Sequence, residues 1–115
     1  MKQYKESYND INKDFIKIKY IYVNDNKLHL SKGKTEFIYN AHISEDFIAQ
    51  NEEYININYI SEISIPEEHS YSIYINSNLG YTTRSYKTFR ISFGDKTFLM
   101  FENQFKKFKN IINNE

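Results

Sequence analysis

The segment YSIYINSNLGYTTRSYKTFRISFGDKTFLMF, residues 71–101, decides the fold because it combines three strand patterns with two turn signals. Side chains of a β-strand point alternately to its two faces, so a half-buried strand alternates apolar and polar residues. Residues 71–76 show this alternation, and the loop NSNLG then supplies the asparagine and glycine that a hairpin requires. We expect a return strand over residues 81–93, a tight Gly-Asp turn, and a further strand over residues 97–101.

The same alternation predicts which side chains of this segment face outward. The inward faces of the first and the return strand are expected to carry Tyr71, Ile73, Ile75, Phe89, Ile91 and Phe93. The outward tyrosines and arginines are then Tyr74, Arg84, Tyr86 and Arg90. Tyrosine and arginine are enriched in binding hot spots, so these four residues are the candidate binding surface. Cross-strand pairs of such residues also stabilise exposed sheets, which is the alternative interpretation.

Toward the N-terminus the chain continues to alternate. Residues 53–65 predict one long strand, or two strands joined at a bulge near Ser61. Residues 14–23 predict another strand, after which the turn signal NDNK returns the chain through two leucines, and a third strand is expected over residues 35–40. Ser44 precedes two acidic residues, which is typical of the first turn of a helix, so we expect one short helical turn there.

The C-terminal residues follow a helical period instead. Phe101, Phe105, Phe108 and Ile112 are spaced by four, three and four residues, which places all four on one helical face. The lysines and the asparagine between them fall on the other face. Burying four such side chains stabilises a fold by about 6 to 12 kcal/mol at most, so we expect the helix to be docked against the strands.

About seven short strands and one terminal amphipathic helix define the expected fold class. We expect an α+β, mostly β, domain that is a strongly bent antiparallel sheet or a partly open barrel whose open end the helix plugs. A flatter α+β sheet with one covering helix is the competing fold. No linker composition interrupts the chain, so residues 14–115 are expected to form one domain after an N-terminal extension, residues 1–13, that is flexible or helical.

Three segments resemble the pleckstrin-homology-like superfold in order and length. YISEISIPEE, YKTFRISFGDKTFLMF and ENQFKKFKNII lie where that superfold has its later strands and its terminal helix, and the resemblance extends over the chain from Asp14 onward. The chain lacks the tryptophan often found in the last helix of that family and the usual basic loop signature for inositol phosphates. The resemblance implies a headgroup or membrane-surface binding domain, with Lys17, Lys19 and Lys27 as its candidate residues.

Several classes of chemistry lack the residues they require. The 115-residue chain has no cysteine, which excludes disulfides, thiolate metal ligands and cysteine nucleophiles. His29, His42 and His69 stand in unrelated contexts without metal-ligand spacing, and no nucleophile elbow, glycine-rich phosphate loop or Walker sequence occurs. We therefore expect a protein that is not an enzyme and binds no metal or cofactor. The lack of a secretory signal and of an apolar run of about 20 residues predicts a cytoplasmic location.

Charge is segregated along the chain although the total is zero. Residues 1–35 sum to +4, residues 36–83 to −8 without one lysine or arginine, and residues 84–115 to +4. Strands of opposite charge attract across a sheet, which is the structural interpretation. The functional one is a dipolar surface, with an acidic face that steers a basic protein or a basic face that meets phosphate. That basic face would hold Arg84, Arg90, Lys106, Lys107 and Lys109.

Small size, absent catalytic motifs and segregated charge favour a non-enzymatic, intracellular protein-binding module. Abundant isoleucine, asparagine, lysine and tyrosine have AT-rich codons, which indicates a low-GC bacterium or its phage. Within this class the hypothesis is an immunity protein or an anti-defence inhibitor that engages a nuclease or toxin. The alternative is the pleckstrin-homology-like headgroup or membrane-surface binder. We do not expect nucleic-acid binding, because the total charge is zero and no nucleic-acid-binding motif is recognised.

Overall fold

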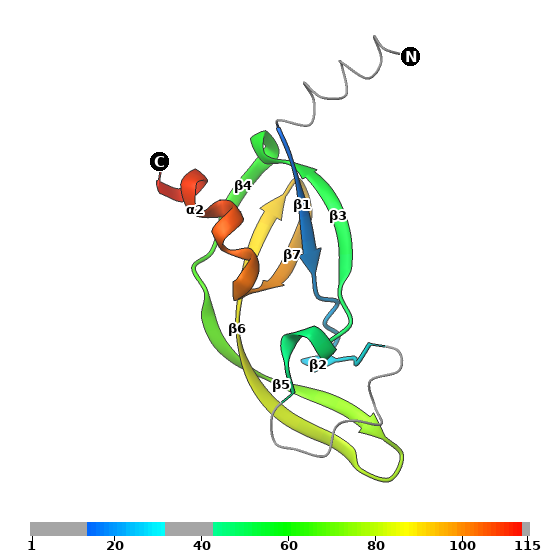
Figure 1. Ribbon diagram of the computed structural model, residues 1–115. Coiled ribbons are helices and arrows are strands. Elements are labelled where there is room, and N and C mark those ends of the chain that lie inside the picture. Colours follow the sequence, from blue (N-terminus) through cyan, green and yellow to red (C-terminus); the bar gives the residue numbers. More distant parts are fainter. Residues whose placement is uncertain (1–13, 32–42, 114–115) are drawn as a thin grey trace, which may run out of the picture.

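The computed structural model describes residues 14–31 and 43–113. Figure 1 shows a curled sheet with one helix at its C-terminal end. The strands of this part of the chain are β1 (Phe15–Tyr20), β2 (Lys27–Leu28), β3 (Asn51–Asn56), β4 (Ile60–Ile63), β5 (Glu67–Asn76), β6 (Gly80–Phe93) and β7 (Lys96–Phe101). Its helices are α2 (Lys106–Asn113) and the short 3-10 turns η2 (Glu45–Phe47), η3 (Ile57–Tyr59) and η4 (Glu102–Gln104). The expected extension, residues 1–13, and the expected strand at residues 35–40 lie outside the described residues.

The long strand β6 organises the main sheet because it is paired on both edges. One edge is antiparallel to β5 and then to β4, and the other edge is antiparallel to β7. The short strand β2 pairs in parallel with β5, with Leu28 opposite Ile73, so its expected return alongside the first strand is wrong. The predicted fold class, a mostly β and strongly bent sheet with a C-terminal helix, is confirmed, although the sheet is mixed and not purely antiparallel.

A second sheet of two strands stands beside β7. β1 and β3 are antiparallel from Phe15, opposite Asn56, to Tyr20, opposite Asn51. Within the described residues one backbone bridge joins this sheet to the main one, where the Ile21 N–H donates to the Leu99 carbonyl over 2.7 Å. The two sheets therefore curl around the interior while touching along a short seam (Figure 1).

The alternating pattern at residues 53–65 forms two strands, β3 and β4, which confirms the expected division, but a turn at residues 57–59 joins them and not a bulge near Ser61. The turn η3 separates them, and the Asn56 side chain starts it by accepting a hydrogen bond from the Asn58 N–H over 2.9 Å. The register of β4 against β6 also shifts at Ser61, where the bulge was expected. The short helical turn predicted after Ser44 is present as η2, and the Ser44 hydroxyl caps it.

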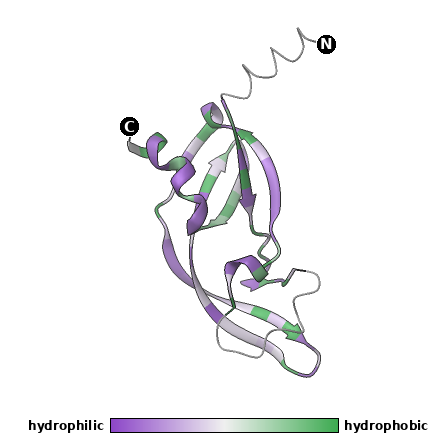
Figure 2. Ribbon diagram, viewed as in Figure 1, coloured by the Kyte–Doolittle hydropathy of each residue, from purple (hydrophilic) through white to green (hydrophobic). Residues whose placement is uncertain are grey.

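Each face of β6 is buried over part of the strand, and each by a different core. The hairpin core covers the face that carries Tyr86, and its residues are Ile21, Leu28, Ile43, Ile48, Tyr71, Ile73, Ile75, Tyr86, Leu99 and Phe101. The helix core covers the opposite face, and its residues are Ile18, Ile55, Phe89, Ile91, Phe98, Met100 and Phe108. Thr88 and Phe89, neighbours in sequence, are buried on opposite faces of the strand. Figure 2 shows hydrophobic and hydrophilic residues alternating along β5, which lies against the hairpin core.

Phenylalanines dock α2 on the helix-core face of β6, as expected. Phe108 is fully buried and its ring centroid lies 5.8 Å from that of Phe89, while half-buried Phe105 meets the same ring at 5.1 Å. Phe101 is a correction, because it ends β7 and does not belong to the helical face. Its ring packs in the hairpin core against Tyr86.

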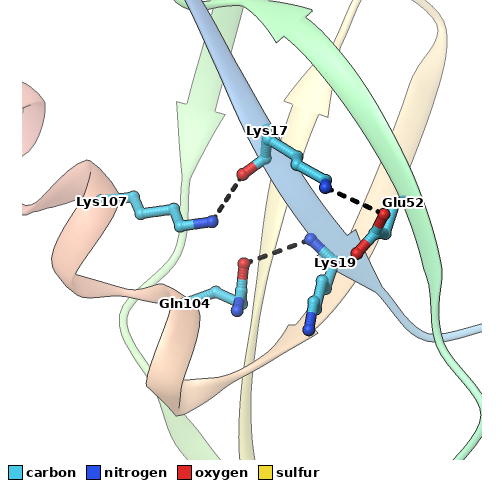
Figure 3. A network of polar contacts seen from close by, with 5 residues as sticks. All are labelled: Lys17, Lys19, Glu52, Gln104 and Lys107. Carbon is cyan, nitrogen blue, oxygen red and sulfur yellow. Dashed lines mark hydrogen bonds and ion pairs between the residues drawn. The ribbon is translucent and has the colours of Figure 1, made fainter.

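Polar contacts join the same C-terminal segment to β1 (Figure 3). Lys107 Nζ donates to the Lys17 carbonyl over 2.6 Å, and Gln104 Oε1 accepts a hydrogen bond from the Lys19 N–H over 3.2 Å. Lys17 Nζ lies 3.1 Å from the Glu52 carboxylate on β3, and this hydrogen-bonded partner raises the pKa of Lys17. Burial, helped by the charges of Lys19 and Lys17, lowers the pKa of Lys107. The C-terminal segment is thus attached to both sheets.

Replacing Phe108 with alanine should destabilise the domain by about 3 to 5 kcal/mol, because loss of a fully buried ring leaves a cavity between α2 and Phe89. Urea unfolding followed by circular dichroism measures the change in the free energy of unfolding. Lys109→Ala, on the exposed side of the same helix, is the control and should stay within about 0.5 kcal/mol of the parent. Equal stability of the Phe108 variant and the parent would contradict the docking of α2.

Candidate binding surfaces

The four predicted binding residues, Tyr74, Arg84, Tyr86 and Arg90, lie in three different places. Directly paired residues of antiparallel strands share a face. Buried Tyr71 pairs with Arg84, so Arg84 and Tyr86, two residues further on, face the interior of the hairpin. Tyr74 faces outward and pairs with Tyr81 instead. Arg90 is exposed farther along β6, so the prediction of one shared outward surface is wrong.

Tyr86 is a core residue, and its expected outward position is wrong. Its side chain is 9% exposed, its hydroxyl donates to the Ile43 carbonyl over 2.7 Å, and its ring packs edge-on against Phe101 at 5.3 Å. Burial is the main reason why the pKa of the Tyr86 phenol is raised to about 12. The Arg84 guanidinium acts to lower this pKa, and the Glu45 carboxylate acts to raise it. Tyr86 therefore ties β6 to the segment before η2.

Arg84 lines an open pocket of about 410 Å³ between β6 and η2. Its Nη1 donates to the Thr82 hydroxyl and to a neighbouring carbonyl, both at 2.7 Å, while its buried Nε has no hydrogen-bond partner within the described residues. Carboxylates also gather near this pocket. Burial raises the pKa of Glu45, and the negative charges of nearby Glu102 and Asp46 raise it further. The lining of the pocket thus combines one guanidinium, of Arg84, with two carboxylates, of Glu45 and Asp46. In the described part of the chain, no three metal-ligating side chains gather in one place.

The outer face of the β5–β6 hairpin, here called the tyrosine face, combines two tyrosines with small hydroxyl side chains. Its residues are Ser70, Ser72, Tyr74, Tyr81, Thr83 and Ser85. Tyr74 and Tyr81 are 42% and 55% exposed, and their ring centroids lie 5.3 Å apart in an edge-to-face arrangement. Farther from the tip, the hydroxyls of Ser70 and Ser85 form a hydrogen bond of 3.1 Å. The face therefore offers aromatic area at the tip and hydrogen-bonding groups behind it.

The hairpin loop fixes the position of both tyrosines. The Asn76 side chain accepts two hydrogen bonds from loop N–H groups at 2.9 and 2.8 Å, and Gly80 adopts a φ of 67°, which glycine tolerates without strain. Lys27 Nζ lies 5.3 Å from the centre of the Tyr81 ring, within cation–π range. Alternation alone does not identify Tyr81 as the partner of Tyr74. The sequence predicts this pairing only if the length and type of the hairpin loop are used to set the register of the two strands.

Arg90 lines a second open space, here called the basic groove, between the end of β1 and the β6–β7 hairpin. The groove has a volume of about 540 Å³ and is formed by residues 20–23, Arg90 and residues 96–99. Among the described residues that line it, Arg90 and Lys96 are charged and none is a carboxylate. The sequence pattern does not identify Lys96 as a groove residue. Lys96 lies near Arg90 only because β7 pairs with β6.

No protein-family model matches the chain, and no curated protein or solved structure matches it. The observed order of elements, a curled and mostly β sheet followed by a C-terminal helix, is compatible with a pleckstrin-homology-like topology. None of the helices within residues 14–31 and 43–113 combines the length and the apolar character that crossing a membrane requires.

Tyr86→Phe should destabilise the domain by about 1 kcal/mol near neutral pH, because the hydrogen bond to Ile43 is lost. The deficit should shrink as the pH rises from 10 to about 12. Over that range the unfolded parent ionises its phenol while the folded parent keeps it neutral, so the parent loses stability. Urea unfolding at several alkaline pH values measures this difference.

Tyr81→Phe is the matched control, because it removes an exposed hydroxyl from the same strand. Its stability should stay within about 0.5 kcal/mol of the parent at every pH. A phenolate absorbance that disappears in Tyr86→Phe but titrates at an ordinary pKa in the parent would contradict the burial of Tyr86.

Proposed function

We propose that this domain is a non-catalytic protein-binding module whose contact surface is the tyrosine face. The observation that carries the proposal is the exposed pair of Tyr74 and Tyr81, two large side chains left in solvent beside four small hydroxyl residues. Tyrosine supplies a large amphipathic contact area at a small loss of conformational entropy, and serine supplies adaptable hydrogen bonds. The same combination is typical of antibody paratopes.

The order of the hairpin supports this proposal, because a surface that is ordered before binding loses less entropy when it binds. The inner face of β5 places Tyr71, Ile73 and Ile75 in the hairpin core, which holds the strands from behind. The side chain of Asn76 orders the loop at the tip. The tyrosine face can therefore meet a partner with little rearrangement.

The charge pattern favours a basic partner, and within this class we propose an immunity protein or an anti-defence inhibitor of a nuclease or toxin. Residues 36–83 carry eight acids and no base, and Glu67 and Glu68 from this segment lie at the base of the hairpin. Clustered charges of one sign speed the encounter with an oppositely charged protein. This role places the protein in the cytoplasm of a low-GC bacterium, either as a host protein or as a phage product.

The double change Tyr74→Ser and Tyr81→Ser tests the contact surface. Both rings are exposed, so the free energy of unfolding should change by only about 1 kcal/mol, mainly through loss of their mutual contact. Affinity for the native partner, captured with the parent domain from the source organism and measured by calorimetry, should fall at least about tenfold.

Tyr54→Ser is the matched control, because Tyr54 is 57% exposed but lies on β3, outside the hairpin. It should bind the partner as the parent does. Full binding by the double variant, together with loss of binding in Tyr54→Ser, would move the contact surface to the β1–β3 sheet and refute the assignment to the hairpin.

The second candidate function is a pleckstrin-homology-like headgroup or membrane-surface binder, and one observation favours it. Burial lowers the pKa of Lys107 of α2, and repulsion from the charges of Lys19 and Lys17 of β1 adds to this shift, although the Lys17 ammonium itself is paired with Glu52 (Figure 3). An anionic phosphate would relieve this repulsion. Lys27 does not join the cluster, since it lies beside Tyr81 at the hairpin.

Sedimentation with vesicles that contain phosphatidylserine tests the second candidate. Binding should be strong at low salt and weaken steeply as salt is added, and Lys19→Gln should weaken it about fivefold. Lys109→Gln removes the same charge from the other side of α2 and is the control. Equal binding to vesicles of neutral lipid alone would exclude this function.

A further inference from the structure

The basic groove opens where β1 and β7 separate. Ile21, the residue after β1, donates to the Leu99 carbonyl in the one bridge of the described residues that joins the two sheets, and the chain then leaves β7 for a turn at Asp25 and Asn26, both of which have positive φ. β7 is paired with β6 along its other edge. Within the described residues, no strand therefore lies beside residues 96–98 on the groove side.

Backbone groups of β7 face this open edge. Successive residues of a paired strand direct their N–H and carbonyl groups to opposite edges. Leu99 directs its carbonyl to Ile21, so Thr97, two residues earlier, directs its N–H and carbonyl toward the same side. The groove therefore presents one donor and one acceptor to which a further strand can bond.

Two cations flank the edge from the two faces of the sheet. Arg90 pairs with Leu99 and shares its face, whereas Lys96 belongs to the opposite face. Within the described residues, neither side chain takes part in an ion pair or a side-chain hydrogen bond. Since none of the described residues lining the groove is a carboxylate, both charges are available to an acidic ligand.

Aromatic side chains complete the groove. Tyr22 is 63% exposed, and Tyr20 packs edge-on against Phe98 with ring centroids 4.9 Å apart. Tyrosine and arginine are enriched at protein interfaces, where they supply apolar area together with hydrogen bonds. A small inorganic anion would leave this aromatic wall without a contact.

We propose that the basic groove binds an extended acidic segment of another protein, which adds as a strand to the open edge of β7. Neighbouring side chains of an added strand point to opposite faces, so carboxylates at adjacent positions reach Arg90 on one face and Lys96 on the other. Each forms a charge-assisted hydrogen bond, and Arg90 is able to form two. This site is separate from the tyrosine face and does not depend on it.

Charge also argues against occupation of the groove by this chain itself. Residues 1–13 and 32–42 together carry five lysines and three acids, so both segments bring further positive charge to Arg90 and Lys96. A second copy that added its own β7 edge would place the same two cations opposite each other. An acidic segment of a different protein is the occupant that the charges favour.

Three fluorescein-labelled decapeptides test the proposal with the intact domain. Each alternates valine and threonine around a central pair, which is Glu-Glu, Gln-Gln or Lys-Lys. Fluorescence anisotropy should show that the Glu-Glu peptide binds at least about tenfold more tightly than the Gln-Gln peptide, and that the Lys-Lys peptide does not bind. The preference for Glu-Glu should decrease as salt is added.

Variants of the two cations connect this binding to the groove. Arg90→Gln and Lys96→Gln should each weaken the Glu-Glu peptide about tenfold, and Arg90→Lys should weaken it less, because it keeps the charge but loses the planar fork. Lys87→Gln removes one exposed charge from the hairpin and should bind as the parent does. The Tyr74→Ser, Tyr81→Ser double variant should also bind normally, which separates this site from the tyrosine face.

Hydrogen exchange followed by NMR tests the added strand directly. The Thr97 amide should exchange at least about tenfold more slowly with saturating Glu-Glu peptide. An unprotected Thr97 amide, equal binding of the Gln-Gln peptide, or unchanged binding by Arg90→Gln and Lys96→Gln would each overturn the proposal. Competition at constant ionic strength is a further test. Displacement of the peptide by inorganic phosphate or by phosphatidylserine vesicles, where chloride does not displace it, would also overturn the proposal.

Discussion

The architecture of this domain depends on a single strand, β6, that buries one face along its first half and the opposite face along its second half. A sheet that is buried on one face needs one covering layer, whereas β6 needs two. The hairpin core covers the face that carries Tyr86, and α2 with the β1–β3 sheet covers the face that carries Phe89. At the crossing point the hydroxyl of buried Thr88 is satisfied by Tyr71 over 2.8 Å, since an unpaired hydroxyl there would be destabilising. The curl of the sheet follows from these two opposed coverings.

Alternation and helical spacing in the sequence predict the strands, the short turn at Ser44 and the docked helix. They do not predict which face of β6 is buried at each point, because a period of two assigns residues to a shared face without saying which face meets the core. Phe89 and Ile91 mark the buried face correctly, but the earlier half of the strand buries the opposite one. Tyr86 is therefore a core residue and not a surface residue.

The residues of the candidate surfaces also differ in how far the sequence predicts them. Tyr74 is predictable from the alternation of β5, whereas Tyr81 requires the hairpin register that Asn76 and Gly80 set. The basic groove is beyond any local pattern, because it exists where two strands distant in the sequence part after the contact of Ile21 with Leu99. The parallel pairing of β2 escapes prediction for a related reason: two residues are too few to show a period.

Within the part of the chain that the structure describes, β7 has an open edge beside residues 96–98, and this edge bears on aggregation. Unpaired strand edges are the usual starting points of aggregation, and natural β proteins protect them with charged side chains, lysine above all. Phe98 and Leu99 lie next to this edge, so the neighbouring stretch would be prone to cross-β assembly if it were uncharged. Lys96 and Arg90 are placed to act as gatekeepers, and removing both would expose a seed for fibre growth. The two charges would then protect this edge from aggregation, in addition to the ligand binding proposed for them.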